Sequence, residues 1–331
     1  MGLHCKRYRP LFPVGSKVCY PYALEKESRF MSSNILVVGS INMDLITVLE
    51  RFPKVGETLL GQTFTTALGG KGSNQAVAAA RLGAQVAMIG AVGDDANGDA
   101  ALKILRQEGV DCSGIAVKTG MSTGIASITV AEGDNHIIVV SGANFALGLA
   151  DIDAHADLFA AADVVLCQLE IPMDCVLHAA QLAKQHGATF VLNPAPAQAL
   201  SAELLALVDV MTPNHTELKQ AFALSETASD ADIAQMLPAH MQLVMTEGAN
   251  GASHYSAAGK RHWPAFKVDV VDTTGAGDTF NAGLAVYWSQ GLDVAVQHAQ
   301  ASAALAVQKL GAQTAMPTAD AVGMFIKQQT R

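Results

Sequence analysis

The sequence predicts an α/β fold with a mostly parallel central sheet, helices on both of its faces, and a small second β-sheet. Six short apolar runs predict buried strands, at 34–40, 86–92, 163–169, 188–194, 208–213 and 242–247. They end in glycine, proline or polar residues and are continuously apolar, as strands covered on both faces are. Helices are expected between and after them, near 73–82, 97–108, 173–186, 214–223, 230–240, 278–290 and 293–310. Because strands alternate with helices, most of the strands are expected to run parallel.

Two stretches, 43–68 and 122–145, break this alternation. Both are rich in Thr, Ile and Val with alternating polar positions, which is typical of antiparallel strands and hairpins. The two stretches could pair as a small sheet over the edge of the main sheet, and that sheet would form a lid. Two unrelated surface excursions are the alternative.

Residues 1–30 differ from the rest of the chain. They are locally basic, contain three prolines and lack the apolar core of a secretory signal. A strong strand pattern follows Met31 directly. We therefore expect 1–30 to be an N-terminal extension outside the fold, and 31–331 to form one domain that includes the lid.

Composition narrows the classes of partner. The net charge is −9 and no basic stripe follows residue 31, so nucleic acid and anionic membranes are not expected partners. No apolar run approaches the roughly 18 residues that a spanning helix needs. The five cysteines form no C-x-x-C pair, which indicates a reduced, cytoplasmic chain without a zinc site.

One glycine turn carries a specific chemical hypothesis. The segment "TTGAGD" (273–278) precedes an expected helix, and amides of Gly275, Ala276 and Gly277 could form an anion hole at its N-terminus. A carboxylate at Asp278 would repel a bound phosphate. It is useful if it takes a proton from an incoming hydroxyl while the amides stabilise a transferring phosphoryl group. On this motif alone, a simple helix cap is an equal alternative.

Other nucleotide motifs are absent from the sequence. There is no G-x-x-x-x-G-K-[ST] loop, and no G-x-G-x-x-G follows the first predicted strand. The H-R-D and D-F-G motifs of protein kinases are missing as well. A P-loop enzyme, a protein kinase and a nicotinamide-dependent oxidoreductase are therefore poor interpretations.

Six segments resemble, in order, the motifs of the ribokinase family of sugar kinases, also called the phosphofructokinase B family. They are "GSINMDL" (39–45), "GGKGSNQAVAAARLGA" (69–84), "QLEIP" (168–172), "NPAPA" (193–197), "TPNHTE" (212–217) and "DTTGAGDTFNAG" (272–283). The resemblance runs from about residue 34 to 325 and is closest to family members that act on ribose. It implies ATP-dependent phosphorylation of D-ribose at its 5-hydroxyl.

The resemblance also implies a sugar site and a catalytic base. Sugar hydroxyls would be held by Asn42, Asp44, Gly70, Lys71, Asn74 and Glu170. Carboxylate and amide groups suit a polyol because each can bridge neighbouring hydroxyls. Asp278 would contact the sugar and accept the proton of its primary hydroxyl, while residues 275–277 would stabilise the γ-phosphoryl group.

The nucleotide and its metal ions are implied by the same resemblance. The ATP site would be lined by Thr246, Gly248, Gly251, Gly277, Asn214 and Glu217. Of these, the last two resemble the N-x-x-E motif of the family and would help to place Mg²⁺ through water. A monovalent cation, usually K⁺, would be bound by Asp272, Thr274, Ala306, Lys309 and Gly311, the last three through backbone carbonyls.

Two departures from the family pattern affect single contacts. Where the family often supplies a serine to the cation, this chain has Thr314 and Ala315. A histidine that can flank adenine aligns with Gln300, although His298 is close by. Neither departure touches the expected phosphoryl transfer.

Alternatives to a ribose kinase remain within and outside the class. A sister kinase could act on another sugar, a sugar acid or a nucleoside. A non-catalytic sugar-binding protein on the same fold would be signalled by an altered Asp278 or G-A-G run, and both are intact. The resemblance further implies a homodimer that pairs through the lid.

Overall fold

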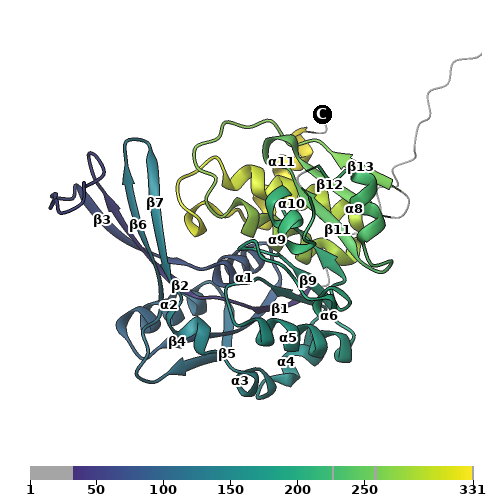
Figure 1. Ribbon diagram of the computed structural model, residues 1–331, viewed down its shortest axis with the longest axis horizontal. Coiled ribbons are helices and arrows are strands. Elements are labelled where there is room, and N and C mark those ends of the chain that lie inside the picture. Colours follow the sequence, from purple (N-terminus) through teal and green to yellow (C-terminus); the bar gives the residue numbers. More distant parts are fainter. Residues whose placement is uncertain (1–32, 226, 257–258, 330–331) are drawn as a thin grey trace, which may run out of the picture. The chain divides into compact units, whose positions relative to one another are not determined.

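The computed structural model describes residues 33–225, 227–256 and 259–329, so the expected extension 1–30 lies outside them. Its centre is a nine-stranded sheet with the order β13-β12-β11-β10-β9-β8-β1-β4-β5 (Figure 1). These strands are β1 (Asn34–Val38), β4 (Gln85–Gly93), β5 (Val110–Lys118), β8 (Val164–Cys167), β9 (Thr189–Leu192), β10 (Val210–Met211), β11 (Gln242–Thr246), β12 (Ala252–Ser256) and β13 (Gly259–Trp263). All neighbours in the part β11-β10-β9-β8-β1-β4-β5 pair in parallel, and β12 and β13 add an antiparallel edge next to β11. The predicted fold class is confirmed.

Helices cover both faces of this sheet. One face carries α1 (Lys71–Arg81), α2 (Ala96–Gln107), α9 (Ala276–Tyr287), α10 (Leu292–Ala306) and α11 (Ala319–Gln329). The other carries α3 (Leu149–Asp153), α4 (Ala156–Ala161), α5 (Met173–His186), α6 (Ala202–Leu205), α7 (His215–Ala221) and α8 (Asp230–Met236). Strand β1 contributes Ile35 and Val37 to the first core and Leu36 and Val38 to the second, because successive strand residues point to opposite faces. Its continuous apolar run therefore fills two cores at once.

A second sheet has the order β3-β2-β6-β7 and comes from the two stretches that break the βα alternation. Its strands are β2 (Asn42–Val48), β3 (Thr63–Gly69), β6 (Gly124–Ala131) and β7 (Asp134–Val140). The pairs β2–β3 and β6–β7 are antiparallel, as expected, but β2 and β6 pair in parallel. The reason is that β2 follows β1 and β6 follows β5. Those two strands end at the same edge of the main sheet, so both inserts leave it in one direction.

Several element boundaries differ from the predicted ones. Helix α8 ends at Met236 rather than near 240, because Pro238 disfavours helical backbone at the residue before it. Helix α10 ends at Ala306 rather than near 310. The carbonyl of Val307 instead accepts hydrogen bonds from the backbone N–H groups of Val271 and Asp272, at 2.7 and 3.1 Å. Strands β5, β12 and β13 and helix α11 were not expected.

The strand order reverses at β1, which lies between β4 and β8. From this point the chain builds the sheet outward in both directions, and ligands of open α/β sheets bind beside the carboxyl ends of the strands there. Four 3₁₀ turns complete the described chain: η1 (Gly142–Ala146), η2 (Gly248–Asn250), η3 (Trp288–Gln290) and η4 (Gln313–Ala315). Within the described ranges, no helix combines the length and apolarity needed to cross a membrane.

Candidate active site

The polar residues expected at the sugar site come from four elements that meet at the carboxyl ends of β1 and β8. Asp44 lies in β2, Glu170 follows β8, Lys71 begins α1, and Asp278 lies in the first turn of α9. Glu170 Oε2 accepts hydrogen bonds from Ser40 Oγ at 2.5 Å and from the Lys71 backbone N–H at 3.1 Å. These contacts join Glu170 to Ser40 and Lys71, which lie 130 and 99 positions before it in the sequence.

Asp278 is buried, with only 8% of the residue exposed, and both of its carboxylate oxygens accept hydrogen bonds from side-chain amides. Asn74 Nδ2 donates to Oδ2 at 2.9 Å, and Gln75 Nε2 donates to Oδ1 at 3.0 Å. Burial raises the pKa of Asp278, while the nearby Lys71 ammonium and the two amides lower it. The carboxylate is thus held in one orientation and in an environment that increases its basicity.

A chain of buried amides behind Asp278 was not foreseen. Gln75 Nε2 also lies 3.2 Å from Asn193 Oδ1, and Gln75 Oε1 accepts from Gln168 Nε2 at 2.6 Å. Gln75, Gln168 and Asn193 each stand within a motif of the sequence. A glutamine in a helix nevertheless looks generic until packing shows which carboxylate it faces.

The turn before α9 has the geometry of an anion cradle. Gly275 has φ +73°, and a Cβ there would lie 2.9 Å from Ala312 Cβ, so both backbone and space call for glycine. The Thr279 N–H already donates to the Gly275 carbonyl at 2.9 Å. The N–H groups of Gly277 and Asp278 lie in the first helical turn, where a helix offers no acceptor of its own. A Cβ on Gly277 would meet nothing within 4 Å, so the space beside it is open.

Carboxylates outnumber ammonium groups in the sugar cluster. Burial raises the pKa of Asp44 to about 6, and the charges of Glu170 and Asp278 add to that rise. Burial lowers the pKa of Lys71, but the charges of Asp278, Glu170 and Glu217 outweigh it and raise the pKa overall. Lys71 therefore stays protonated among several acids.

Asn42 is oriented by a partner that the sequence did not reveal. Asn144, in η1, donates through Nδ2 to Asn42 Oδ1 at 2.8 Å and accepts from the Ile41 backbone N–H at 2.8 Å. A Cβ on Gly124 would collide with both asparagine side chains. The hydrogen bond from Asn144 therefore fixes the orientation of the Asn42 amide.

The expected nucleotide residues lie across β10 and β11. Asn214 caps α7: its Oδ1 accepts from the Glu217 N–H at 2.9 Å, while Glu217 Oε2 accepts from the Asn214 N–H at 2.8 Å. Burial raises the pKa of Glu217, and Lys71 and Asp278 both act on this carboxylate. One Glu217 oxygen remains for a hydrated cation, so the pair fits Mg²⁺ held through water.

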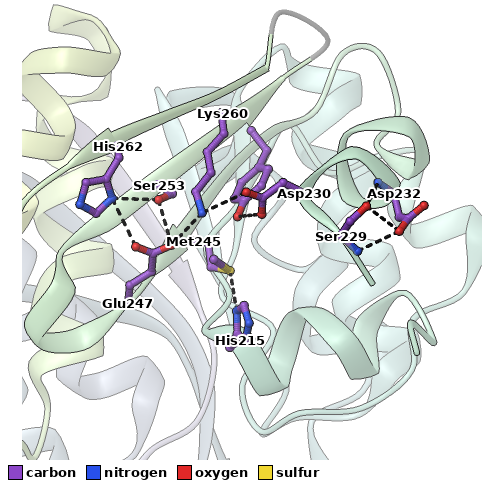
Figure 2. Close-up of polar contacts among 10 residues, drawn as sticks. His215, Ser229, Asp230, Asp232, Met245, Glu247, Ser253, Lys260 and His262 are labelled. Atoms are coloured by element: carbon purple, nitrogen blue, oxygen red, sulfur yellow. Dashed lines mark hydrogen bonds and ion pairs between the residues drawn. The ribbon is translucent and has the colours of Figure 1, made fainter. Parts of the chain in front are cut away.

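Thr246 ends β11, and the loop that follows holds Gly248 and Gly251 and is held through Glu247. Figure 2 shows the Glu247 carboxylate among Ser253 Oγ at 2.9 Å, Lys260 Nζ at 3.5 Å and His262 Nδ1 at 3.3 Å. Gly251 has φ +108°, and a Cβ there would collide with the Trp263 carbonyl at the end of β13. The antiparallel edge strands therefore brace this loop.

The residues expected at a monovalent cation are tied together directly. Asp272 Oδ1 accepts from the Thr274 backbone N–H at 2.9 Å and from Thr274 Oγ1 at 2.7 Å, and Asp272 Oδ2 accepts from the Gly311 N–H at 2.8 Å. The turn after α10 is thereby fastened to the turn before α9 at Gly311. Ala306 is the last residue of α10, and its carbonyl accepts from the Lys309 N–H at 3.2 Å. Carboxylate and carbonyl oxygens are the donor type that a hard cation takes.

The two departures from the family pattern have structural roles of their own. Gln300, 8% exposed, donates through Nε2 to the Trp263 carbonyl at 2.9 Å, and His298 stacks on Tyr287 with ring centroids 4.0 Å apart. Thr314 Oγ1 donates to the Leu310 carbonyl at 2.7 Å, and Ala315 is buried.

Known proteins share both the sequence and the fold of this chain. Residues 32–319 match the family described as pfkB family carbohydrate kinase. Ribokinase of Bacillus subtilis (strain 168) is 44% identical over 292 residues, which cover 87% of this chain and 98% of that protein. The solved structure of Arabidopsis thaliana ribokinase complexed with ribose and ATP has a TM-score of 0.83 at 31% identity, over 90% of this chain and 99% of that one. Deoxyribokinase of Salmonella typhi is 35% identical over 301 residues, 88% of this chain and 98% of that protein.

Proposed function

Because the chain belongs to the pfkB family of carbohydrate kinases, we propose that it uses ATP to phosphorylate D-ribose at the 5-hydroxyl, giving D-ribose 5-phosphate and ADP. The observation that carries this proposal is Asp278: a buried carboxylate, held by two amides, beside an open helix N-terminus. A base next to an anion cradle is what transfer of a phosphoryl group to a hydroxyl requires. The relatives named for ribose favour that sugar.

The reaction divides the site into three tasks. Asn42, Asp44, Gly70, Lys71, Asn74 and Glu170 hold the sugar and present its 5-hydroxyl to Asp278. Asp278 accepts the hydroxyl proton as the oxygen attacks the γ-phosphorus, and the bond from that phosphorus to the β-phosphate oxygen breaks. The amides of Gly275 and Gly277, with the dipole of α9, stabilise the charge on the transferring group, whereas the expected Ala276 N–H already donates to the Thr273 carbonyl at 3.2 Å.

We assign the nucleotide to Thr246, Gly248, Gly251 and Gly277, with Asn214 and Glu217 positioning Mg²⁺ through water. Mg²⁺, when bound, neutralises charge on the phosphates. We assign K⁺ to Asp272 and Thr274 with the carbonyls of Ala306, Lys309 and Gly311. Ala315 cannot supply the side-chain oxygen that a serine would, so a carbonyl or Thr314 would complete that coordination.

The sheet β3-β2-β6-β7 would act as a lid over the sugar, because β2 carries Asp44 and pairs directly with β6. We further propose that two lids pair in a homodimer, and that residues 1–30 are an extension outside the kinase domain of 31–331. Since the reaction consumes cellular ATP, we place the enzyme in the cytoplasm.

Initial rates of ADP release with Mg·ATP test this function. D-ribose is compared with 2-deoxy-D-ribose, fructose, adenosine and 2-keto-3-deoxygluconate, each with and without K⁺, and the phosphorylated carbon is identified by NMR. Highest kcat/KM for ribose, with the product at C5, supports the proposal. Preference for 2-deoxyribose or another substrate reassigns the sugar, and sugar binding without turnover on any substrate would indicate a non-catalytic binding protein.

A further inference from the structure

Helix α1 holds the loop 311–316 at two points. Near its start, Asn74 Oδ1 accepts a hydrogen bond from Gln313 Nε2 at 3.0 Å. Seven residues later, Arg81 donates to the backbone carbonyls of Gln313 and Met316, the latter at 3.3 Å. Seven residues are close to two helical turns, so both side chains face the same side of α1. The loop is therefore fixed to the helix that carries Asn74.

Arg81 is itself held in place. Its Nε and Nη2 donate to the two oxygens of Glu108 at 2.9 and 2.6 Å, a bidentate pair that fixes the plane of the guanidinium. Both side chains are only about a quarter exposed. This anchor lies where α2 ends, so the position of the loop depends on the packing of α1 and α2.

Asp278 and Gln313 together fix which way the Asn74 amide points. Asn74 has one carbonyl oxygen and one NH₂ group. The oxygen faces the Gln313 donor, and the NH₂ group donates to Asp278 Oδ2. Exchanging the two ends would put an acceptor against the carboxylate and a donor against a donor. Asp278 can only accept and so takes the NH₂ end, while the Gln313 donor satisfies the oxygen end and reinforces this orientation.

We propose that Gln313 is a positioning residue for the catalytic base: it orients Asn74, and Asn74 in turn holds Asp278 for proton abstraction. This inference rests on the proposed function for the role of Asp278. Arg81 and Glu108 support it by holding the backbone of Gln313. The same loop begins at Gly311, whose N–H donates to Asp272 in the turn before α9. That turn is therefore connected to Asn74 through the short segment from Gly311 to Gln313.

The charged groups around Asp278 set what a change at Gln313 does to its titration. Lys71 of α1 faces it as a cation, and Glu170, Asp44 and Glu217 act on the same cluster as anions from three other elements. Substitution of Gln313 alters none of these groups, but a glutamate at 313 adds an anion that itself raises the pKa of Asp278, so the NMR comparison below is needed beside the pH profile. Loss of the Asn74 donor removes a hydrogen bond that favours the charged carboxylate, so the acid limb of the kcat–pH profile should move to higher pH.

Three variants test the proposal. In Gln313→Glu an acceptor replaces the donor at unchanged size, so two carboxylates compete for the Asn74 NH₂ group and its bond to Asp278 is weakened. We expect kcat to fall about tenfold or more, the effect of losing a hydrogen bond to a charged group, with the acid limb at higher pH. Gln313→Lys retains a donor and should restore both the kcat and the limb in large part. Arg81→Lys should show a smaller effect in the same direction.

Gln181→Ala is the control, since Gln181 is an exposed glutamine on α5 that contacts only Glu203 among the side-chain bonds described. Its pH profile should match that of the unaltered protein. A Gln313→Glu variant with normal kcat and an unmoved acid limb, even with a lower melting temperature, would show that Gln313 only stabilises the loop and would overturn the proposal.

A measurement without turnover separates this inference from the proposed function. With ¹⁵N-labelled asparagine, the side-chain amide signal of Asn74 is identified by its loss in Asn74→Ser. We expect this signal to move in Gln313→Glu and to return towards its original position in Gln313→Lys. If the unaltered protein fails to phosphorylate ribose, the proposed function is wrong, while the NMR comparison still decides whether Gln313 orients Asn74. An unmoved signal refutes the inference.

Discussion

Asp278 combines burial with two amide donors, and the balance between them suits the role of base that we propose for it. Desolvation raises the pKa of the carboxyl, whereas Lys71, Asn74 and Gln75 favour its charged form. The same residues also fix its direction. A carboxylate that must accept one particular proton gains from both effects, because the proton acceptor is already oriented when the sugar arrives.

Asp278→Asn should therefore abolish most of the turnover while leaving the fold intact. We expect kcat to fall by about 10²–10⁴, the usual contribution of a general base, with a smaller change in KM for ribose. Asp157→Asn is the control, because Asp157 is also in the first turn of a helix, α4, but is exposed. A kcat for Asp278→Asn within a few-fold of the unaltered protein would exclude a role as base.

The raised pKa of Asp44 predicts that the carboxylate proposed to bind the sugar lowers the free energy of unfolding at neutral pH. Its pKa of about 6 in the folded protein exceeds the ordinary value of 3.8, so the folded state binds this proton more tightly than the unfolded state does. Stability from this group is fully present below pH 4 and is lost as the pH rises through 6. At pH 8 the charged carboxylate should cost about 2–3 kcal/mol of unfolding free energy.

Asp44→Asn should raise the free energy of unfolding at pH 8 by up to that amount, and the gain should shrink steadily between pH 6 and pH 4. Urea unfolding without sugar measures it, and KM for ribose should rise in the same variant. Equal stability of the two proteins at pH 8 would mean that burial of this carboxylate is not costly.

At the scale of elements, the entry of α1 depends on the absence of a side chain at its second residue. A Cβ on Gly72 would come within 2.6 Å of the backbone of Gly39 and Ser40, so β1 and α1 could not meet as they do. Gly72→Ala should lower the free energy of unfolding by about 1–3 kcal/mol and also reduce turnover, because Lys71 and Asn74 move with the helix.

Gly323→Ala is the matched comparison, since Gly323 also lies inside a helix, α11, but a Cβ there would meet nothing within 4 Å. This change should raise stability by about 0.5–1 kcal/mol through helix propensity alone, with turnover unaltered. Thermal melts of both variants decide the matter: the two shifts must have opposite signs.

Elements with a strong local pattern could be predicted from the sequence. The bounds expected for α5 coincide with those observed, and the apolar runs of β1 and β4 predict both strands. Strands β12 and β13 were missed because "ASHYS" and "GKRHW" contain polar and charged residues that an edge hairpin tolerates. Their pairing depends on β11, which no local pattern encodes.

Within the candidate site, too, residues in a local sequence motif could be predicted, whereas residues that depend on distant partners could not. Residues 275–278 stand out because glycine and aspartate at a helix start have few other uses. Gln75, Asn144 and Gln313 carry no such signal, since their partners lie 203, 102 and 239 positions away along the chain. A buried amide is informative only when its acceptor is known, and packing supplies that acceptor.

At the scale of the whole molecule, the exposed apolar residues of β7 favour an interface with another chain. It is an edge strand of the second sheet, and Ile137, Ile138, Val139 and Val140 are all 47–67% exposed. Because alternate residues point to opposite faces, both faces of this edge are apolar, which is an unfavourable arrangement for a strand in water. Pairing of two such sheets would cover it, and this supports the proposed homodimer.

Ile138→Lys should therefore shift the protein from dimer to monomer, as measured by sedimentation velocity across a dilution series. Val117→Lys, at a comparably exposed valine of β5, should leave the oligomer unchanged. If the unaltered protein sediments as a monomer at micromolar concentration, the dimer is excluded whatever the variants do.

The candidate sugar-site residues lie beside the carboxyl ends of β1 and β8, and this placement has a practical consequence. Helix α5 ends next to the start of β9, on the side where the strands begin, and its last residue, His186, is exposed. The cysteines in the described part of the chain, Cys112, Cys167 and Cys175, are all buried. With Cys5 and Cys19, which lie outside the described residues, replaced by serine, a thiol introduced as His186→Cys would react ahead of the three buried ones. A dye or bead attached through it would leave the candidate sugar site facing the solution.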